Sequence, residues 1–411
     1  MQRTMVHENR GLGRQSGATA RGRRARARAF ARVALLGLAL GLLALLAGTH
    51  PGRTAVRTLF FLPEMFPSTP LRPLTWISAA PRCEELTLPY ADTEAIGDLC
   101  YPAGTEQHGG IVLSLGVHPL DRQDPFLVRL TDGLARTNMA VLRVQSPDLS
   151  AGRIVTREVD GLVAAFRALQ GRSEVDPARV GLAGFSVGGS MSTVAAADPR
   201  IRDDVRLVYS FGGYYDAFAV LGAISDGYVR DGAVERAWTP HPWTVHVFAE
   251  QIVGALPEGE ERDYLTALLQ AAHEERDGPD WEPPALPLPL STVGQMVYGL
   301  VVGDGRVDGA ALLAALPPAT RDTFGQLSPA AHVAGLRAPL FVMHDVGDTL
   351  IPYTESRRLV ESLPPDVPRR YDEFHMFEHV YPRDPLAVLG FLPDLARLYG
   401  HLYSVLLLVT D

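Results

Sequence analysis

Short apolar runs alternate with amphipathic stretches along most of the chain. The apolar runs are continuous, a pattern typical of strands in a parallel sheet that is covered on both faces. The stretches between them have the spacing of helices. The predicted strands lie at 111–115, 140–144, 180–183, 205–209 and 340–343, and the predicted helices at 127–136, 158–169, 186–197 and 354–363. This order predicts an α/β fold, in which ligands bind at the carboxyl ends of the strands.

A serine follows one of these predicted strands in a pattern associated with nucleophiles. Ser186 is the centre of the pentapeptide Gly-Phe-Ser-Val-Gly at 184–188, between a strand and a helix. A strand, a sharp turn and a helix in this order expose a serine hydroxyl as a nucleophile, and the glycines allow the strained turn and close packing. A five-residue motif also arises by chance, so context has to support it. An Asp-Pro turn at 176–177 supplies that context by ending the preceding helical stretch.

Two segments of the chain stand out together: 176–189, which contains the pentapeptide, and Met-His-Asp-Val-Gly-Asp-Thr-Leu-Ile-Pro at 343–352. With these segments the chain resembles the α/β-hydrolase superfamily, nearest to dienelactone-hydrolase-like proteins and related esterases. The resemblance covers about residues 83–402. It implies an α/β-hydrolase sandwich, with a mostly parallel sheet, helices on both faces and a helical lid insertion. Dienelactone hydrolases usually carry Cys at the elbow, where this chain has Ser186.

A serine nucleophile needs a base to accept its proton and an acid to orient that base. The resemblance implies the chain order Ser, acid, His, with the acid after a late strand. Asp348 lies in a Gly-Asp turn after such a strand and is the predicted acid. A turn aspartate that only stabilises its own loop is the alternative interpretation. Asp345 and Asp216 are lesser candidates for the acid.

Two histidines lie in one short loop after a predicted strand at 369–374. The resemblance places the catalytic histidine in this loop. We predict that His379 is the base, because it lies deeper in the loop and has room to reach the nucleophile, with His375 as the alternative base. The other ten histidines are interpreted as ordinary surface or core residues.

The tetrahedral intermediate of acyl transfer needs backbone N–H groups directed at its oxyanion. Val187 follows the nucleophile directly and is the first predicted donor. Val117, in the loop after the strand at 111–115, is the predicted second donor, and Gly116 lets the backbone approach. The same loop contains His118, for which an ordinary loop histidine is the simpler interpretation.

The alternation of strands and helices stops between about 211 and 338. This stretch contains an aromatic segment at 238–248 and a charged, helix-like part at 258–276. Because long structureless loops are uncommon in compact domains, the stretch predicts a lid inserted over the site. Such a lid would form the acyl and alcohol pockets. The apolar stretch at 395–409 has no uninterrupted run long enough to span a membrane, and it predicts a final helix packed on the sheet.

Composition excludes several other mechanisms. All 38 residues counted as Lys or Arg are arginine, so Schiff-base, pyridoxal and Walker A chemistry are excluded because each needs a lysine. The chain has no His-Glu-x-x-His motif and its two cysteines are far apart in sequence, so we expect no metal. No Gly-x-Gly-x-x-Gly opens a helix after a strand, so we expect no cofactor.

The amino terminus differs in character from the rest of the chain. Residues 1–32 carry nine arginines and one acidic residue, a net charge of +8. Because the whole chain has a net charge of −9, the remaining residues carry −17. A basic tail beside an acidic body indicates sorting rather than nucleic-acid binding. Residues 33–49 carry no charge and have the minimum length of a transmembrane helix, and the arginines before them would stay in the cytoplasm.

We therefore predict a basic cytoplasmic tail (1–32), a transmembrane signal anchor (33–49), a linker (50–82) and a hydrolase domain (83–411) outside the cytoplasm. The protein would be a single-pass protein of the cell membrane. Secretion after cleavage of a signal peptide is the alternative.

Cys83 and Cys100 lie in a predicted hairpin that turns at Ala91-Asp92. In this register the two cysteines are directly opposed, and opposed strand positions bring Cβ atoms within about 4.5–5.5 Å, close to disulfide geometry. Outside the cytoplasm such a pair forms a disulfide. Two buried thiols are the alternative.

Together these features predict a membrane-anchored serine hydrolase that cleaves carboxylic esters through a Ser-His-Asp triad and an acyl-enzyme. The predicted partners are a small-molecule or lipid-like ester and the membrane, with no nucleic acid. The ester is supported by the resemblance alone, since thioesterases and peptidases use the same machinery. A non-catalytic, membrane-tethered binding protein of this fold is the alternative from another class.

Overall fold

The computed structural model describes residues 48–104, 106–117, 122–275, 289–303, 307–383 and 391–410, with isolated positions between 30 and 46. The chain divides into two compact units, Met1–Val56 and Arg57–Asp411, and the second contains the sheet. Nearly all of the predicted tail and about half of the predicted anchor lie outside the described residues. Among the residues that are described, no helix combines the length and the apolar character needed to cross a membrane.

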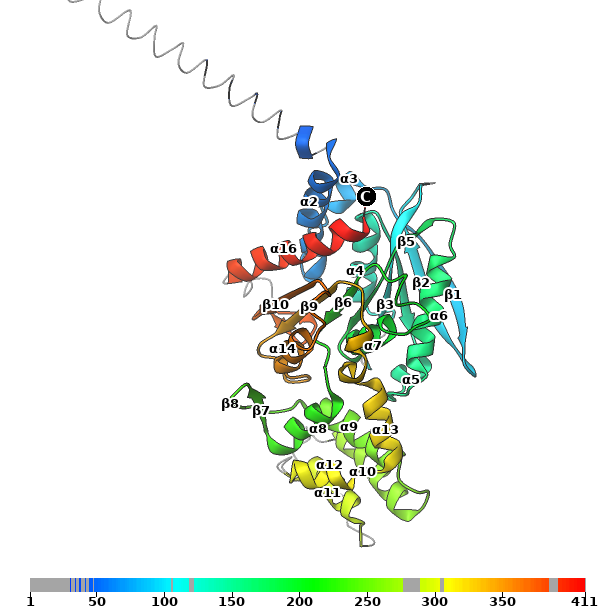
Figure 1. Ribbon diagram of the computed structural model, residues 1–411, viewed down its shortest axis with the longest axis vertical. Helices are drawn as coiled ribbons and strands as arrows, with labels where there is room; N and C mark the ends of the chain where they lie inside the picture. The colour runs from blue at the N-terminus through cyan, green and yellow to red at the C-terminus, as the bar shows by residue number, and fades with distance from the viewer. Residues whose placement is uncertain are drawn as a thin grey trace, which may run out of the picture. The chain divides into compact units, whose positions relative to one another are not determined.

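An eight-stranded sheet forms the centre of the second unit (Figure 1), with the strand order β1-β2-β4-β3-β5-β6-β9-β10. β1 and β2 form an antiparallel hairpin, β2 pairs antiparallel with β4, and the other pairs are parallel. The strands are β1 (Arg82–Tyr90), β2 (Thr93–Tyr101), β3 (His108–Ser114), β4 (Met139–Gln145), β5 (Val175–Phe185), β6 (Val208–Phe211), β9 (Leu340–Asp345) and β10 (Arg369–Phe374). The predicted mostly parallel sheet is confirmed.

Helices cover both faces of this sheet. Successive side chains of a strand point to opposite faces, so the continuous apolar strands need an apolar partner on each face. The helices of the chain after β1 and outside the insertion are α4 (Pro125–Arg136), α5 (Pro147–Ser150), α6 (Glu158–Gln170), α7 (Val187–Ala196), α14 (Tyr353–Glu361) and α16 (Leu392–Val409). Val112 belongs to the core beneath α6 and α7, whereas Ile111 and Leu113 belong to the core beneath α4 and α16. The chain therefore has the α/β-hydrolase fold, and its final helix packs on the sheet as expected.

The segment before the sheet is part of this compact unit. It contains the end of α2 (His50–Phe61), the 3₁₀ turn η1 (Leu62–Met65) and α3 (Leu74–Ile77). Phe61 and Leu74 are fully buried in the core beneath α4. Arg129 of α4 holds the same segment with all five of its N–H donors, which reach the Glu64 carboxylate and the carbonyls of Pro63, Pro67, Thr69 and Leu71. The predicted linker at 50–82 is therefore too long, because its later part is packed structure.

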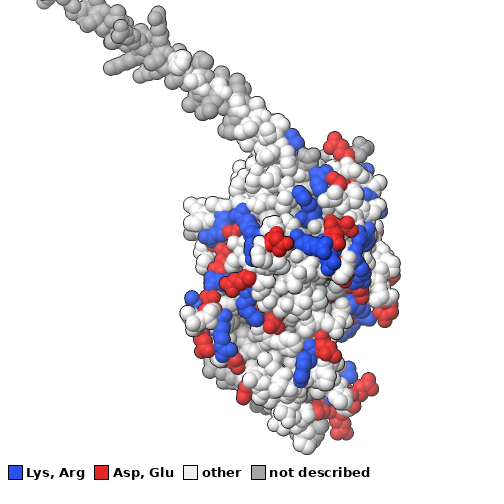
Figure 2. Space-filling view, in the orientation of Figure 1, with Lys and Arg blue, Asp and Glu red and all other residues white. Residues whose placement is uncertain are grey.

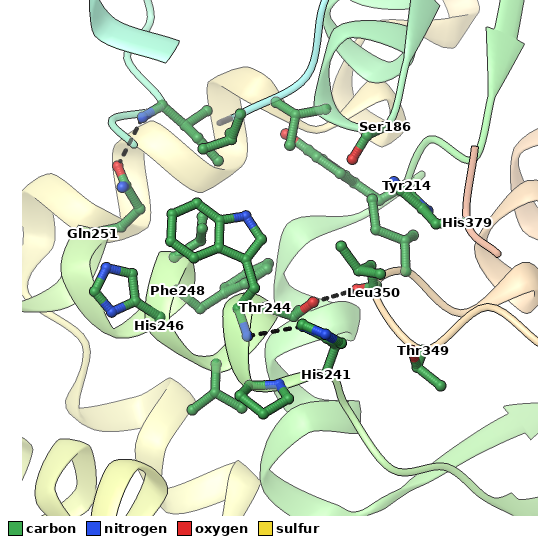
Figure 3. Close-up of a pocket in the computed structure, with 18 of the residues that line it drawn as sticks. Ser186, Tyr214, His241, Thr244, His246, Phe248, Gln251, Thr349, Leu350 and His379 are labelled. Atoms are coloured by element: carbon green, nitrogen blue, oxygen red, sulfur yellow. Dashed lines mark hydrogen bonds between the residues drawn. The ribbon is translucent and has the colours of Figure 1, made fainter. Parts of the chain in front are cut away.

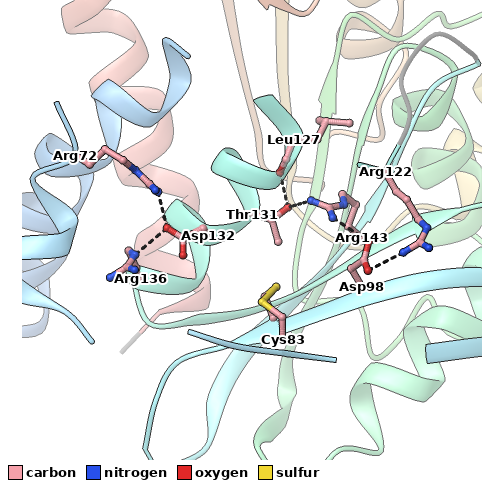
Figure 4. Close-up of a disulfide and its surroundings, with 10 residues drawn as sticks. Arg72, Cys83, Asp98, Arg122, Leu127, Thr131, Asp132, Arg136 and Arg143 are labelled. Carbon is pink, nitrogen blue, oxygen red and sulfur yellow. Dashed lines mark hydrogen bonds and ion pairs between the residues drawn. A yellow bond between two sulfur atoms is a disulfide. The ribbon is translucent and has the colours of Figure 1, made fainter. Parts of the chain in front are cut away.

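The hairpin at the sheet edge carries the disulfide (Figure 4). Cys83 lies opposite Cys100 in the β1–β2 register, and their sulfurs are bonded. The bond closes a loop with a sequence separation of 17, which stabilises the fold by about 3 kcal/mol through the unfolded state. Nearby, Asp98 accepts from Arg143 at 2.9 Å and from Arg122 at 2.8 Å. Arg143 is buried, so this pairing compensates the cost of burying its charge.

A helical insertion separates β6 from β9, and we call its residues 217–335 the cap. Figure 1 shows its helices grouped at one end of the sheet. Its described elements are α8 (Ala217–Asp226), β7 (Tyr228–Asp231), β8 (Val234–Ala237), α9 (Pro242–Gly254), α10 (Glu260–Glu275), α11 (Thr292–Val302), α12 (Gly309–Ala315), α13 (Pro318–Leu327), η2 (Pro329–Ala331) and η3 (Val333–Gly335). The cap occupies the stretch in which the sequence pattern predicts a lid.

Candidate active site

Ser186 lies at the sharp turn between β5 and α7. Its backbone has φ 52° and ψ −131°, a conformation that L-residues rarely adopt. Its N–H donates to the carbonyl of Phe211 at 2.8 Å, which fixes the turn against the neighbouring strand β6. A strained non-glycine residue held in this way is typical of a nucleophile elbow.

The two glycines of the pentapeptide are required by close backbone contacts. A Cβ atom on Gly184 would lie 2.2 Å from the carbonyl carbon and oxygen of Gly188. A Cβ atom on Gly188 would lie 2.5 Å from the carbonyl oxygen of Leu115, the residue that follows β3. Real Cβ atoms do not approach backbone atoms this closely, so the elbow cannot form here with larger residues.

Asp348 lies in the turn after β9 and is held from several sides. Its Oδ1 accepts from the backbone N–H groups of Leu350 at 2.7 Å and Ile351 at 3.0 Å. Its Oδ2 lies 2.6 Å from Nδ1 of His379. Burial alone raises the pKa of Asp348, but the two histidines in contact with it, His379 and His344, outweigh burial and hold the pKa below its usual range. The carboxylate is therefore ionised and aligned with the His379 ring.

His344 is a second histidine on this carboxylate, and no role had been predicted for it from the sequence. Its Nε2 lies 3.1 Å from Asp348 Oδ2 and 3.0 Å from the carbonyl oxygen of Ile351. Both partners are acceptors, so Nε2 carries the proton. Its Nδ1 lies 2.6 Å from the hydroxyl of Ser356 on α14. The available sequence signal was its position at the end of a buried strand, four residues before the predicted acid.

His379 lies between the short strands β11 (Phe377–Glu378) and β12 (Tyr381–Pro382), with a positive φ of 56°. Its Nε2 is buried and has no hydrogen-bond partner among the described residues. It lines the same cavity as Ser186 (Figure 3), although the structure records no hydrogen bond between these two described side chains. The structure thus brings His379 both to Asp348 and to the cavity that Ser186 lines, with Nε2 unpaired among the described residues.

The other candidates for acid and base lie elsewhere. The side chain of His375 is 59% exposed, and its Nδ1 lies 3.6 Å from Asp394 rather than near Asp348. Asp345 accepts from the N–H of Phe377 at 2.8 Å, which holds the loop that carries His379, and burial raises the pKa of Asp345. Asp216 caps the amino end of α8.

The two residues predicted as oxyanion donors line the same cavity as Ser186. Val187 begins α7, where backbone N–H groups have no partner within the helix. Val187 and Val117 both line the cavity with Ser186, and Gly116 is buried next to Val117. His118 falls outside the described residues.

The cavity that Ser186 lines has a volume of about 830 Å³, and residues of the cap form a large part of its wall. Its described lining is mostly apolar and aromatic, and Glu378 is the one lining residue with a carboxylate or guanidinium side chain. Trp243 and His246 of α9 stack with ring centroids 5.1 Å apart, and His273 of α10 lies 5.0 Å from each. A space of this size and character suits the apolar part of a ligand. The described residues contain no group of acidic, histidine or cysteine side chains that could hold a metal ion.

Comparisons with known proteins give structural likenesses only. No family model and no curated protein matches the chain. An esterase from Pyrobaculum calidifontis is 14% identical with a TM-score of 0.46, covering 89% of this chain and 97% of that one. The metagenomic carboxylesterase EstE1 is 14% identical with a TM-score of 0.45, covering 81% and 92%. An acylaminoacyl peptidase from Pyrococcus horikoshii is also 14% identical, with a TM-score of 0.45, covering 79% of this chain and 40% of that one, so the chain spans about two fifths of its length.

Proposed function

We propose that the chain is a serine hydrolase that cleaves carboxylic esters with Ser186 as nucleophile, His379 as base and Asp348 as the orienting acid. The observation that carries the proposal is the 2.6 Å contact between Asp348 Oδ2 and His379 Nδ1 at a cavity that also holds the strained Ser186. This contact fixes the His379 tautomer that has a free Nε2, the nitrogen that a base needs for the serine proton.

The reaction follows from these positions. Ser186 Oγ attacks the ester carbonyl carbon as its proton passes to His379 Nε2, and the N–H groups of Val187 and Val117 stabilise the oxyanion. The carbon–oxygen bond to the alcohol then breaks, and Nε2–H gives that alcohol its proton. Water attacks the resulting acyl-enzyme with its proton taken by Nε2. Collapse releases the carboxylic acid and restores the Ser186 hydroxyl.

The cavity points to an ester with a large, uncharged apolar group. No guanidinium lines the described cavity wall, so a carboxylate or phosphate on the bound part would lack an arginine partner. About 830 Å³ of largely apolar space favours a lipid-like or ring-bearing acyl or alcohol group over a short polar one.

Labelling with a fluorophosphonate probe tests the nucleophile. We expect covalent labelling of the wild-type protein and none of the Ser186→Ala variant, with Ser362→Ala as a control because Ser362 is exposed at the end of α14. Chromogenic esters of increasing acyl length, with matched thioesters and anilides, identify the bond that is cleaved. An unlabelled, folded wild-type protein would contradict the hydrolase and favour a binding protein.

We also propose that residues 33–49 anchor the protein in the cell membrane, with the domain on the extracytoplasmic side. The proposal is supported by the uncharged run, the arginines before it and the Cys83–Cys100 disulfide. We expect the full-length chain to remain in carbonate-washed membranes and the double substitution Leu42→Arg and Leu43→Arg to release it. A mature amino terminus after Thr49 would instead indicate secretion.

A further inference from the structure

A short segment of the cap binds the turn that carries the proposed acid. We call residues 238–244 the clamp segment and residues 348–350 the acid turn. The indole N–H of Trp238 donates to the carbonyl of Asp348 at 2.9 Å. The backbone N–H of His241 donates to the carbonyl of Thr349 at 2.8 Å. The hydroxyl of Thr244 donates to the carbonyl of Leu350 at 2.9 Å, as Figure 3 shows. Three successive carbonyls of the acid turn are therefore fixed by the cap.

The N–H side of the same turn is fixed by the acid itself. Asp348 Oδ1 accepts from the backbone N–H of Leu350, whose carbonyl accepts from Thr244. The carboxylate and the clamp segment thus hold both backbone polar groups of Leu350, its N–H and its carbonyl. A shift of the clamp segment would move the acid turn, and with it the oxygen that lies 2.6 Å from His379.

The clamp segment also forms part of the cavity wall. His241, Trp243 and Thr244 line the cavity together with Ser186 and His379. A group bound in the cavity therefore contacts the same segment that fixes the acid. Contacts between the enzyme and a part of the substrate remote from the reacting carbonyl raise kcat when they order the catalytic groups.

We infer that Trp238 and Thr244 are positioning residues, through which the cap sets the alignment of Asp348 with His379. This inference rests on the proposed hydrolase function. The two donors act through the carbonyls of the acid turn, and they hold the carboxylate in the geometry needed to orient the base. The cap thereby serves the reaction as well as the binding of substrate.

The variants Trp238→Phe and Thr244→Val test this inference in the full-length protein. Trp238→Phe keeps an aromatic ring without the N–H, and Thr244→Val keeps the shape without the hydroxyl. Loss of one hydrogen bond of this kind is expected to lower kcat about five-fold with KM for a short ester unchanged. Thr244→Ser keeps the hydroxyl and should restore kcat. The fluorophosphonate labelling rate should fall in parallel, because the small probe does not depend on the cap for binding.

Trp76→Phe is the matched control for the tryptophan change, because Trp76 is 69% exposed and lies outside the cap. Near-ultraviolet circular dichroism and thermal unfolding verify that each variant is folded, and if Trp238→Phe fails to fold, the Val and Ser variants at 244 decide alone. Wild-type kcat in Thr244→Val, or equal losses in Thr244→Val and Thr244→Ser, would overturn the inference. A wild-type protein that neither labels nor hydrolyses esters would instead overturn the proposed function.

Discussion

Replacing His379 by Ala is expected to lower kcat/KM for an ester by about 10⁴- to 10⁶-fold, because members of a triad act as a unit. His379 provides the buried, unpaired Nε2 that would take the Ser186 proton, and Nδ1 is already engaged by Asp348. The expected measurement is steady-state hydrolysis of a chromogenic ester, together with the fluorophosphonate labelling rate. The residual activity should come from substrate binding and the oxyanion donors.

His375→Ala is the matched control, because it removes a histidine from the same loop without touching the acid. The His375 side chain is exposed and faces Asp394. We expect this variant to keep kcat/KM within about two-fold of the wild type, as surface substitutions usually have small effects. A large loss in His375→Ala with little loss in His379→Ala would reassign the base to His375.

Asp348→Asn is expected to lower kcat/KM by about 10³- to 10⁴-fold while leaving the shape of the side chain intact. Oδ1 of Asp348 accepts hydrogen bonds from two backbone N–H groups, so the amide oxygen of Asn, which is also an acceptor, will take the position of Oδ1. The amide NH₂ then faces Nδ1 of His379 and the Nε2–H of His344. Because the amide NH₂ is a donor, Nδ1 of His379 must accept from it, and the ring proton must then lie on Nε2. A protonated Nε2 cannot accept the proton of Ser186.

The control for this change is Asp366→Asn, because Asp366 is exposed in the loop after α14. Ester hydrolysis and labelling are measured on both variants, with thermal unfolding as a measure of folding. An Asp348→Asn protein that is folded and within about ten-fold of wild-type kcat/KM would exclude Asp348 as the acid, since a misplaced tautomer costs far more than that.

The fold was predictable because its signals are local. Continuous apolar runs mark buried strands of a parallel sheet, and the pentapeptide around Ser186 marks a strand-to-helix turn. The same local reasoning placed Asp348 after a strand end and two histidines in one loop. The choice between His379 and His375 rested on position in that loop, and the structure shows one of them against Asp348 and the other against Asp394.

The features that the sequence did not reveal depend on contacts between distant segments. The contact of His344 with Ser356 requires the end of β9 to lie beside α14, and nothing in the pattern around His344 indicates a polar partner. The clamp segment meets the acid turn across more than a hundred residues of sequence, and one of its three donors is a backbone N–H, which carries no sequence signal. The packed segment before Cys83 was missed because the residues of α4 that hold it are distant in sequence.

The backbone conformation of Ser186 lowers the free energy of unfolding of the protein. A non-glycine residue in a sparsely populated conformation costs of the order of 1–3 kcal/mol, against a net stability of about 5–15 kcal/mol for a typical domain. The surrounding sheet and α7 must supply that free energy in every folded molecule, whether or not substrate is present. A chain selected for stability alone would not need such a residue at this turn, and the φ of 52° is therefore a folding cost that the proposed nucleophile would explain.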